Sequence, residues 1–382
     1  MPTIIDSDQH LYESRTLWLE YIEPARRDDA LRIEDDAAGT PWLQWHGQRV
    51  GLAEVQLPGR TMQIGEEHRR VRNGLPPLVH YDEALPLDYW SPVARLAKLA
   101  DLGLDEAVLF PNYGLLWERT LHSSLAALQA NMAAWNQWCA VVAAEGHGRL
   151  HPVAHLTLRD AEWLETQLAT LSAAGVRLAM VAPALVDGRP LSHPDHDRLW
   201  AAFCHHGVTP VFHVADQPRP FADGWYTDEG DAFVPTLSAV FIHAAAALAS
   251  ADLILNGTLE RFPDLRIGIV ELSAVWVPLF LMMLDGGWSF TRQLNGRDPS
   301  ALSLQPSEYF RRQIRVSSFS YENPAALQQQ IGGDLLMCCS DYPHSEGTST
   351  PIVDYAFGGS GPSPATAPGL FHNNVAFLLR RI

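Results

Sequence analysis

The sequence predicts an α/β fold, a single (β/α)8 barrel, and three observations lead to that prediction. Short runs with β character recur along the chain, and each is followed by a segment with helical periodicity. Eight such runs can be counted, which is the number that closes a barrel of parallel strands. Several of the predicted helices end in a glycine just before the next run, at Gly103, Gly146, Gly175 and Gly207.

The elements follow in order along the chain. The predicted strands are short runs that are mostly apolar, at 3–10, 106–111, 150–156, 177–183, 209–215, 266–272, 314–320 and 335–341. The predicted helices repeat apolar residues at spacings of three and four, at 93–102, 121–145, 161–174, 195–206, 234–260, 275–284 and 324–331. A final helix at 372–380 completes the ring.

Three segments interrupt this alternation. An insertion at 24–92 follows the first strand and contains a hairpin pattern, in which 42–45 and 49–52 flank a His-Gly pair. A long loop at 216–235 follows the fifth strand, and a Gly/Pro/Ser-rich segment at 358–369 predicts a flexible tether. Because the loops after barrel strands form the active-site face, we expect the first two segments to cover a pocket. Residues 1–382 are thus expected to form one domain.

Composition and charge exclude several classes of function. The 382 residues include 44 acidic and 27 basic side chains, and the net charge of −17 disfavours partners such as nucleic acid or an anionic membrane. The longest apolar stretch, 272–284, contains Pro278 and is shorter than the ~20 residues of a membrane span. The first residues lack a signal-peptide pattern, and the four cysteines form no CxxC pair. We therefore expect a cytoplasmic protein without a transmembrane helix.

Ligand-type side chains gather where the predicted strands end. They are Asp8, His10, His155, His213, Glu271 and Asp341. Because the carboxyl ends of parallel strands share one rim of a barrel, these side chains are expected to converge there. Buried carboxylates and imidazoles need compensation, which a metal ion would supply. Each residue alone has a simpler explanation, such as a hydrogen-bonded histidine or a helix N-cap at Asp341. To explain the whole set without a metal, however, such independent explanations would have to hold on several strands at once.

Two further histidines are candidates for the site, and several competing motifs are absent. His344 lies in the loop after the last strand, where a supporting role or a substrate contact is expected. His243 lies near the start of a helix, and its position is equally consistent with a pocket residue and with a packing residue. The chain has no GxGxxG after a strand, no P-loop lysine motif, no HExxH and no GxSxG. Nucleotide, nicotinamide and serine-hydrolase functions therefore lose support.

At these residues the chain resembles the amidohydrolase superfamily, in the branch that includes aminocarboxymuconate-semialdehyde and resorcylate-type decarboxylases. The resemblance rests on four segments in the family's order: IDSDQH at 5–10, VFHVAD at 211–216, NGTLERFPDLRIGIVE at 256–271 and CSDYPHSEG at 339–347. It implies a metal-dependent (β/α)8 barrel with ligands at Asp8, His10, His213 and Asp341.

Two departures from the family pattern affect the expected chemistry. Asp8 stands where the family's decarboxylases have His or Glu, and Glu271 stands where they carry a catalytic histidine. A carboxylate at neutral pH is a ligand or a base, not a proton donor, which argues against decarboxylation by the usual route. The donors suffice for two metal ions, with Glu271 or Asp341 as a bridge. Carboxylate-rich ligation favours iron or manganese, and zinc remains open.

These departures resemble a dinuclear non-haem iron monooxygenase offshoot of the superfamily, which includes a hydroxylase of platensimycin and platencin diterpenoids. The leading interpretation is therefore a diiron monooxygenase of natural product biosynthesis that hydroxylates an apolar small molecule, such as a terpenoid acid or its thioester. It would need O2 and an external electron donor. The alternative is a metal-dependent hydrolase or decarboxylase of a small carboxylated substrate, and a metal-free barrel that binds a small ligand is a third interpretation.

Roles for individual residues complete the expectation. Glu271, Asp341 and His243 are the candidate catalytic residues. The candidate substrate contacts are Trp45, Trp90, Trp225, Arg219 and His344. For each aromatic residue taken alone, ordinary packing of the insertions is the simpler interpretation. A homodimer is left open, since the sequence carries no signal for oligomeric state.

Overall fold

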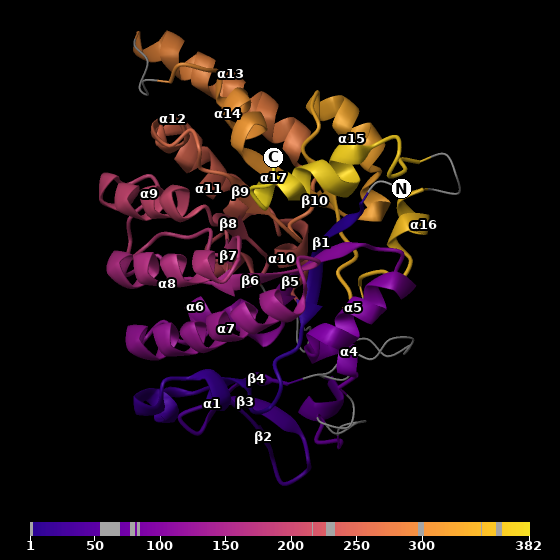
Figure 1. The fold of residues 1–382 in the computed structure, drawn as a ribbon. Helices are drawn as coiled ribbons and strands as arrows, with labels where there is room; N and C mark the ends of the chain where they lie inside the picture. Colours follow the sequence, from indigo (N-terminus) through magenta and orange to yellow (C-terminus); the bar gives the residue numbers. More distant parts are fainter. Residues whose placement is uncertain are drawn as a thin grey trace.

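Eight parallel strands form the central sheet of the computed structural model, in the order β1–β5–β6–β7–β8–β9–β10–β11 (Figure 1). The structure describes residues 3–53, 69–76, 81, 85–215, 217–226, 234–296, 302–344, 346–356 and 361–382. The strands are β1 (Ile5–Leu11), β5 (Glu106–Pro111), β6 (Leu150–His155), β7 (Leu178–Met180), β8 (Thr209–Phe212), β9 (Ile267–Ile269), β10 (Ile314–Ser318) and β11 (Leu336–Cys338). Each overlaps one predicted strand, and the predicted (β/α)8 barrel is confirmed.

The barrel closes between its first and last strands, next to residues predicted to bind metal. The backbone N–H of His10 donates to the Tyr342 carbonyl at 2.8 Å, and that of Asp341 donates to the Asp8 carbonyl at 2.9 Å. Gln9 and Tyr342 form a parallel bridge at the same point. These bonds satisfy backbone groups that would otherwise be unpaired at two sheet edges.

Helices surround the sheet. They are α1 (Leu17–Tyr21), α4 (Leu87–Trp90), α5 (Pro92–Asp101), α6 (Trp117–Thr120), α7 (Leu125–Glu145), α8 (Ala161–Ala173), α9 (Asp197–His206), α10 (Thr236–Val240), α11 (Ala244–Leu255), α12 (Thr258–Arg261), α13 (Val277–Asn295), α14 (Pro306–Gln313), α15 (Pro324–Ile331), α16 (Pro351–Tyr355) and α17 (Asn374–Leu378). Their apolar sides pack on the strands and form the larger of two buried clusters.

Two helix predictions need correction, and α1, α4, α6, α14 and α16 were not predicted. The predicted helix at 234–260 is three helices, α10, α11 and α12, because the chain turns at 241–243 and again at Gly257, whose φ of 76° is left-handed. The predicted helix at 275–284 continues to Asn295 as α13. Helix α14 was not predicted, although Pro306 at its first turn and Glu308 in a capping box are start signals.

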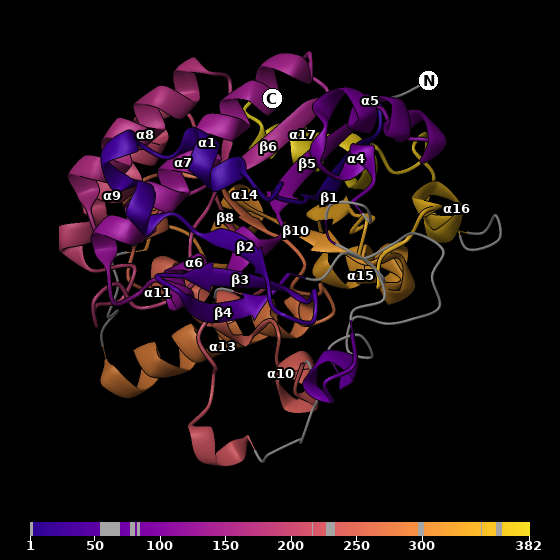
Figure 2. The same cartoon turned by 90° about the horizontal axis from the view of Figure 1, so that it is seen from below.

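The segment at 24–92 holds a small antiparallel sheet of its own. The predicted hairpin is present as β3 (Pro41–Trp45) and β4 (Gln48–Leu52), and β2 (Arg32–Asp35), which was not predicted, pairs with β3. Seen from below, this sheet lies in front of the barrel strands (Figure 2). Parts of this segment, of 216–235 and of 358–369 lie outside the described residues.

The barrel interior is packed at one end by the C-terminus of the chain. Val108, Val153 and Met337 lie inside the ring of strands together with Val375 and Leu378 from α17. The Thr209 hydroxyl donates to the Leu378 carbonyl at 2.7 Å. The last helix therefore belongs to the core, in agreement with the predicted C-terminal helix.

One stretch among the described residues, Thr236–Leu255, is long and apolar enough to cross a membrane by length and composition alone. A core helix passes the same test, and α11 within this stretch buries Ala246, Leu253 and Ile254 against the barrel. The expectation that no segment crosses a membrane stays a prediction.

Candidate metal centre

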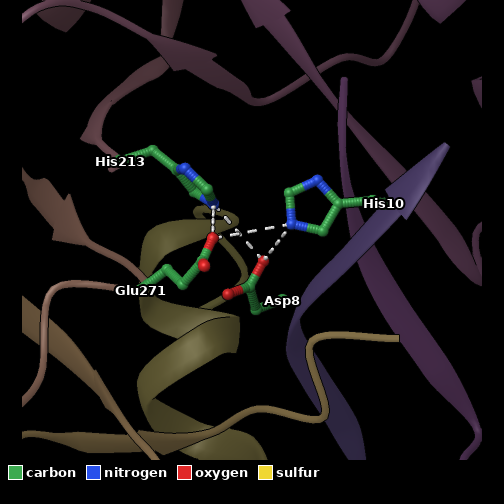
Figure 3. Close-up of side chains that lie close together, drawn as sticks. All are labelled: Asp8, His10, His213 and Glu271. Carbon is green, nitrogen blue, oxygen red and sulfur yellow. Dashed lines mark ion pairs between the residues drawn. The ribbon is translucent and has the colours of Figure 1, made fainter. Parts of the chain in front are cut away.

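Six carboxylates and imidazoles, all buried except the partly buried His344, meet at the carboxyl end of the barrel. Asp8 and His10 come from β1, His213 follows β8, Glu271 follows β9, and Asp341 and His344 follow β11. Figure 3 shows Asp8, His10, His213 and Glu271 pointing toward one another. Strands far apart in the sequence supply these groups because the ends of all parallel strands share one rim.

The donors form two overlapping groups. The first is Asp8, His10, His213 and Glu271, and the second is His10, Glu271, Asp341 and His344. Within each group, one ligand atom of every residue lies within 4.8 Å of the others. His10 and Glu271 belong to both groups, so the second group extends the first around the rim.

The shortest distances join imidazole nitrogens to carboxylate oxygens. His213 Nε2 lies 3.1 Å from Glu271 Oε2 and 3.5 Å from Asp8 Oδ1. His10 Nε2 lies 3.2 Å from Asp341 Oδ1, 3.5 Å from Asp8 Oδ1 and 3.7 Å from Glu271 Oε2. These nitrogen and oxygen atoms surround a small common space, and the His10 and His213 rings lie on two sides of it (Figure 3).

Each imidazole uses its other nitrogen on a neighbouring oxygen. Nδ1 of His10 lies 3.0 Å from the Pro111 carbonyl, and Nδ1 of His213 lies 3.2 Å from the Val214 carbonyl. A carbonyl oxygen can only accept, so these nitrogens carry the proton of the neutral ring. In the neutral tautomer, Nε2 then presents a lone pair to the carboxylates. Metal-binding histidines are characteristically oriented in this way.

His344 is oriented in a similar way, with one ring nitrogen facing a supporting oxygen and the other facing a carboxylate. Its Nε2 lies 2.9 Å from the side-chain oxygen of Asn112, and its Nδ1 lies 2.9 Å from Asp341 Oδ1. The ring also stacks on His10 with centroids 3.8 Å apart. Asn112 directly follows β5, so a strand without a ligand of its own orients a histidine from β11.

Buried polar atoms at the centre lack hydrogen-bond partners. They are both carboxylate oxygens of Asp8 and of Asp341, Oε2 of Glu271, Nε2 of His10 and of His213, and Nδ1 of His344. Buried polar atoms are normally paired, and leaving one unpaired costs about 1–3 kcal/mol. Lone pairs of neutral imidazoles and of carboxylates would repel one another, whereas a cation between them would be attracted to all. The donor set therefore fits a divalent metal ion.

Two of the carboxylates sit on strained backbone. The φ angles of Glu271 and Asp341 are 54° and 56°, a left-handed conformation that side chains with a Cβ adopt rarely. Such residues cost about 1–3 kcal/mol each and cluster at functional sites. Ser317 Oγ accepts the Glu271 N–H at 2.9 Å, and the Asp8 carbonyl accepts that of Asp341, so bonds to neighbouring strands hold both conformations.

In the metal-free protein, protons take the place of a cation. Burial raises the pKa of Asp8 well above its usual value, and burial with the Asp341 charge raises the pKa of Glu271 to about 7. Burial lowers the pKa of His213 to about 4. Burial alone would lower the pKa of His10, but the neighbouring Asp341 and Glu271 carboxylates outweigh this effect and raise the pKa above its usual value. Metal binding at this centre must therefore displace protons.

A second buried network holds β1 beneath the centre. Asp6 accepts from the Ser340 N–H at 3.0 Å and from Gln9 Nε2 at 2.8 Å, and it also accepts from the Ser340 hydroxyl. Arg95 donates to Gln9 Oε1 at 3.0 Å and to the His10 carbonyl at 2.8 Å. Asp6 thus serves as a hydrogen-bond acceptor, and β1 is fixed on both sides of Asp8.

The predicted ligand His155 lies outside both donor groups. It is fully buried at the end of β6, and its backbone N–H donates to Asn136 at 2.9 Å. The structure instead places His344 among the donors, which the sequence assigned to a supporting or substrate-contact role. The sequence carries one signal for His344, its position three residues after Asp341. The His344 N–H donates to the Asp341 carbonyl at 2.8 Å, and the resulting turn brings both side chains together.

The remaining predicted site residues are not members of the two donor groups. His243, half-buried before α11, stacks on Trp276 with centroids 5.6 Å apart. Trp45 ends β3 and stacks on His46, and Trp90 ends α4. Two further candidates lie in the segment after β8: Trp225 is largely exposed, and Arg219 lies 3.9 Å from Asp223 and over the Tyr226 ring. The structure does not bring these residues into the donor groups.

Comparisons with known proteins agree with this architecture. The sequence profile of a family described as amidohydrolase matches residues 5–381. No curated protein matches the chain significantly. Among solved structures, an amidohydrolase from Mycobacterium avium subsp. paratuberculosis K-10 is 21% identical and has a TM-score of 0.76, with 99% of each chain covered.

Two decarboxylases are similar in fold over their whole length. The 5-carboxyvanillate decarboxylase from Novosphingobium aromaticivorans, solved with bound manganese and 3-methoxy-4-hydroxy-5-nitrobenzoic acid, is 15% identical with a TM-score of 0.64, covering 99% of this chain and 97% of that one. The 2,6-dihydroxybenzoate decarboxylase from Rhizobium is 15% identical with a TM-score of 0.62, covering 100% and 99%. At these identities the likeness establishes the fold alone.

Proposed function

The chain belongs to the amidohydrolase family of metal-dependent enzymes, and from this premise we propose that it is a decarboxylase of a small carboxylated substrate. The observation that carries the proposal is the buried set of carboxylates and imidazoles whose unpaired atoms face one another at the barrel rim. The similar decarboxylases support this alternative better than the monooxygenase that led the sequence interpretation.

Glu271 bears directly on the choice. The sequence argued against decarboxylation because a carboxylate replaces the family's catalytic histidine and would be ionised at neutral pH. Burial and the Asp341 charge instead raise the pKa of Glu271 to about 7, so the metal-free side chain can carry a proton at neutral pH. Glu271 is also placed where a proton donor is needed, because its side chain is slightly exposed at the edge of the centre, whereas Asp8 is fully buried.

The residues divide into holding and reacting groups in this proposal. Asp8, His10, His213 and Asp341 would hold the ion, which would supply a positive charge that orients the substrate carboxylate and stabilises developing negative charge. The bond between the carboxylate and its carbon breaks, CO2 leaves, and the electron pair stays on that carbon. Glu271 then takes up a proton from solvent and passes it to the same carbon, which leaves the side chain ionised again.

The substrate contacts and the domain organisation stay part of the proposal. Residues 1–382 would form one barrel domain, with 24–92 as a lid, 216–235 as an active-site loop and 358–369 as a tether. Trp45, Trp90, Trp225 and Arg219 come from the first two of these segments, and His243 is kept as a candidate catalytic residue. In this proposal these residues contact a small molecule that enters the barrel mouth.

A second candidate function rests on the overlap of the two donor groups. Because His10 and Glu271 belong to both, two ions could share these ligands, and carboxylate-rich sites suit iron or manganese. With two iron ions, O2 and an external reductant, such a centre would perform the monooxygenase chemistry that led the sequence interpretation. Zinc remains an option for a single-ion centre.

Metal analysis combined with two activity assays tests the proposal. Protein stripped with a chelator is reloaded with Mn²⁺, Zn²⁺ or Fe²⁺, and CO2 release is measured on a panel of aromatic and aliphatic carboxylic acids. We expect release with at least one ion, its loss in Asp8→Asn, and its retention in His205→Gln, which changes an exposed histidine of α9. Two bound irons with O2 uptake on adding ascorbate, and no CO2, would reject decarboxylation in favour of the monooxygenase.

A further inference from the structure

A cavity outside the metal centre lies on the same rim of the barrel. It has a volume of about 210 Å³, and its described lining comes from α6, which follows β5, and from the segments after α6, β6, β7 and β8. None of these described lining residues belongs to the two donor groups. The carboxyl end of the barrel therefore has a second hollow that metal binding does not explain.

The cavity has the size of one part of a small molecule. An engineered apolar cavity of ~150 Å³ binds benzene, whereas pockets that enclose a whole drug-sized ligand measure ~300–1,000 Å³. By this comparison, a volume of about 210 Å³ suits a group of roughly six to eight non-hydrogen atoms. The rest of such a molecule would have to lie outside the cavity, along the rim.

Much of the cavity wall is apolar. The apolar residues that line it are Leu158, Ala182, Ala184, Leu185, Val186 and Pro218. Leu185 is 65% exposed, so an apolar group that enters the cavity would remove part of its surface from water. The wall therefore favours a ligand group that is itself apolar over most of its length.

The polar side of the cavity offers a hydrogen-bond donor. Its charged residues balance, with two arginines, Arg119 and Arg159, and two acids, Glu118 and Asp187. Arg159 donates through Nε to Asp187 Oδ1 at 2.9 Å and through Nη1 to the His122 carbonyl at 3.0 Å. No described residue accepts from Nη2 of Arg159, so this nitrogen can donate to a ligand. An uncharged oxygen suits it better than a carboxylate, which would face Asp187 and unbalance the lining.

The turn that carries Asp187 is held rigidly. Val186 and Arg189 exchange two backbone hydrogen bonds, at 2.9 and 3.0 Å, around Asp187 and Gly188. Both central residues have positive φ angles, 47° and 82°, as in the tight hairpin turns that favour Asp-Gly. Because this wall is fixed before a ligand arrives, little conformational entropy is lost on binding.

We propose that this cavity holds the arm of the substrate that is remote from its reacting carboxylate, an inference that rests on the proposed decarboxylase function. The substrate is then a carboxylic acid whose arm is apolar and ends in an uncharged oxygen that accepts from Arg159. Neighbouring strands lie ~4.7–4.9 Å apart, so the ends of β7 and β6 stand roughly 5–10 Å along the rim from β8, which His213 follows. A molecule of that length reaches the metal centre and the cavity at once.

Binding of straight-chain carboxylates tests the inference without any turnover. Calorimetry with the Mn²⁺-loaded protein should give dissociation constants that fall up to about fourfold for each CH2 added between butanoate and heptanoate, as the chain enters the cavity. The keto acid 6-oxoheptanoate should bind about three- to tenfold more tightly than heptanoate, because its ketone oxygen accepts from Arg159. An affinity that stays constant from butanoate to heptanoate would overturn the inference.

Two variants and a control assign the effect to this cavity. Ala184→Phe fills the space, so the gain in affinity with chain length should disappear while Mn²⁺ affinity stays the same. Ala201→Phe makes the same change at an exposed position of α9 and should leave the gain intact. Arg159→Gln should remove only the preference for 6-oxoheptanoate over heptanoate.

The outcomes separate this inference from the proposed function. A chain-length gain that survives in Ala184→Phe would overturn the inference, as would tighter binding of heptanedioate than of 6-oxoheptanoate. A gain that is lost in Ala184→Phe, with no CO2 released from any acid tested, would support the cavity as a binding site and reject decarboxylation alone.

Discussion

Replacing Glu271 by glutamine should stabilise the metal-free protein and weaken the metal-bound one. The pKa of Glu271 rises from 4.5 to about 7 because burial and the Asp341 charge disfavour the carboxylate. One pKa unit corresponds to 1.36 kcal/mol, so ionised Glu271 costs the metal-free fold up to about 3 kcal/mol. Glutamine keeps the shape of the side chain and removes that charge.

The sign of the pH dependence follows from the direction of the shift. Because the folded-state pKa lies above the unfolded value, folding favours the protonated acid, and the penalty grows as pH rises from about 4.5 to about 7. Metal-free Glu271→Gln should therefore exceed the wild type in free energy of unfolding by about 1–3 kcal/mol at pH 8. At pH 5 the difference should be below about 1 kcal/mol, because only part of the penalty has developed there.

With metal bound, the same substitution should act in the opposite direction. A unit charge about 4 Å from another contributes about 4 kcal/mol at an effective dielectric constant near 20. Loss of the Glu271 charge, whose Oε2 lies 3.1 Å from His213 Nε2, should raise the metal dissociation constant roughly a thousandfold. Stabilisation of the protein by a fixed Mn²⁺ concentration should shrink accordingly.

Denaturant unfolding at pH 5 and pH 8, with EDTA or with Mn²⁺, measures all of these quantities. Glu165→Gln is the matched control, because it makes the same chemical change at an exposed glutamate paired with Arg198. Its effect should stay within about 0.5 kcal/mol under every condition. The reasoning fails if metal-free Glu271→Gln gains the same stability at both pH values, or if the variant binds Mn²⁺ as tightly as the wild type.

Three further predictions concern the surroundings of the centre. Asn112→Ala should lower metal affinity about 10–100-fold, measured by chelator competition, because Asn112 orients His344, which contacts Asp341; unchanged affinity would mean that His344 does not support the metal site. Metal affinity should fall up to tenfold per displaced proton between pH 7 and pH 6, because Glu271 in the metal-free protein is protonated below about pH 7. Calorimetry in two buffers should detect the released protons, and a pH-independent affinity would contradict this prediction. Leu378→Ala should destabilise the barrel by about 2–5 kcal/mol in denaturant unfolding with metal stoichiometry unchanged, because Leu378 is buried in the barrel interior.

Local patterns were sufficient for most of the fold. The strands are apolar runs bounded by turn residues, and helices such as α8 and α15 carry regular apolar spacing, so their positions follow from short stretches of sequence. Helix α14 escaped because its eight residues, PSEYFRRQ, are mostly polar, and β2 escaped because its RIED sequence lacks a strand pattern. The start signals of α14 are local but cover only its first turn, whereas β2 is a strand because it pairs with β3.

The sequence by itself determined that carboxylates and imidazoles would end several strands of one barrel, because strand position and the shared rim follow from the chain's periodicity. Only the tertiary structure decided which of them meet. The direction of a side chain at a strand end depends on backbone angles and on neighbours: left-handed φ angles at Glu271 and Asp341 and the turn that returns His344 to Asp341. His155 ends its strand as predicted and yet stays outside the donor groups, since burial at a rim does not fix where a ring points.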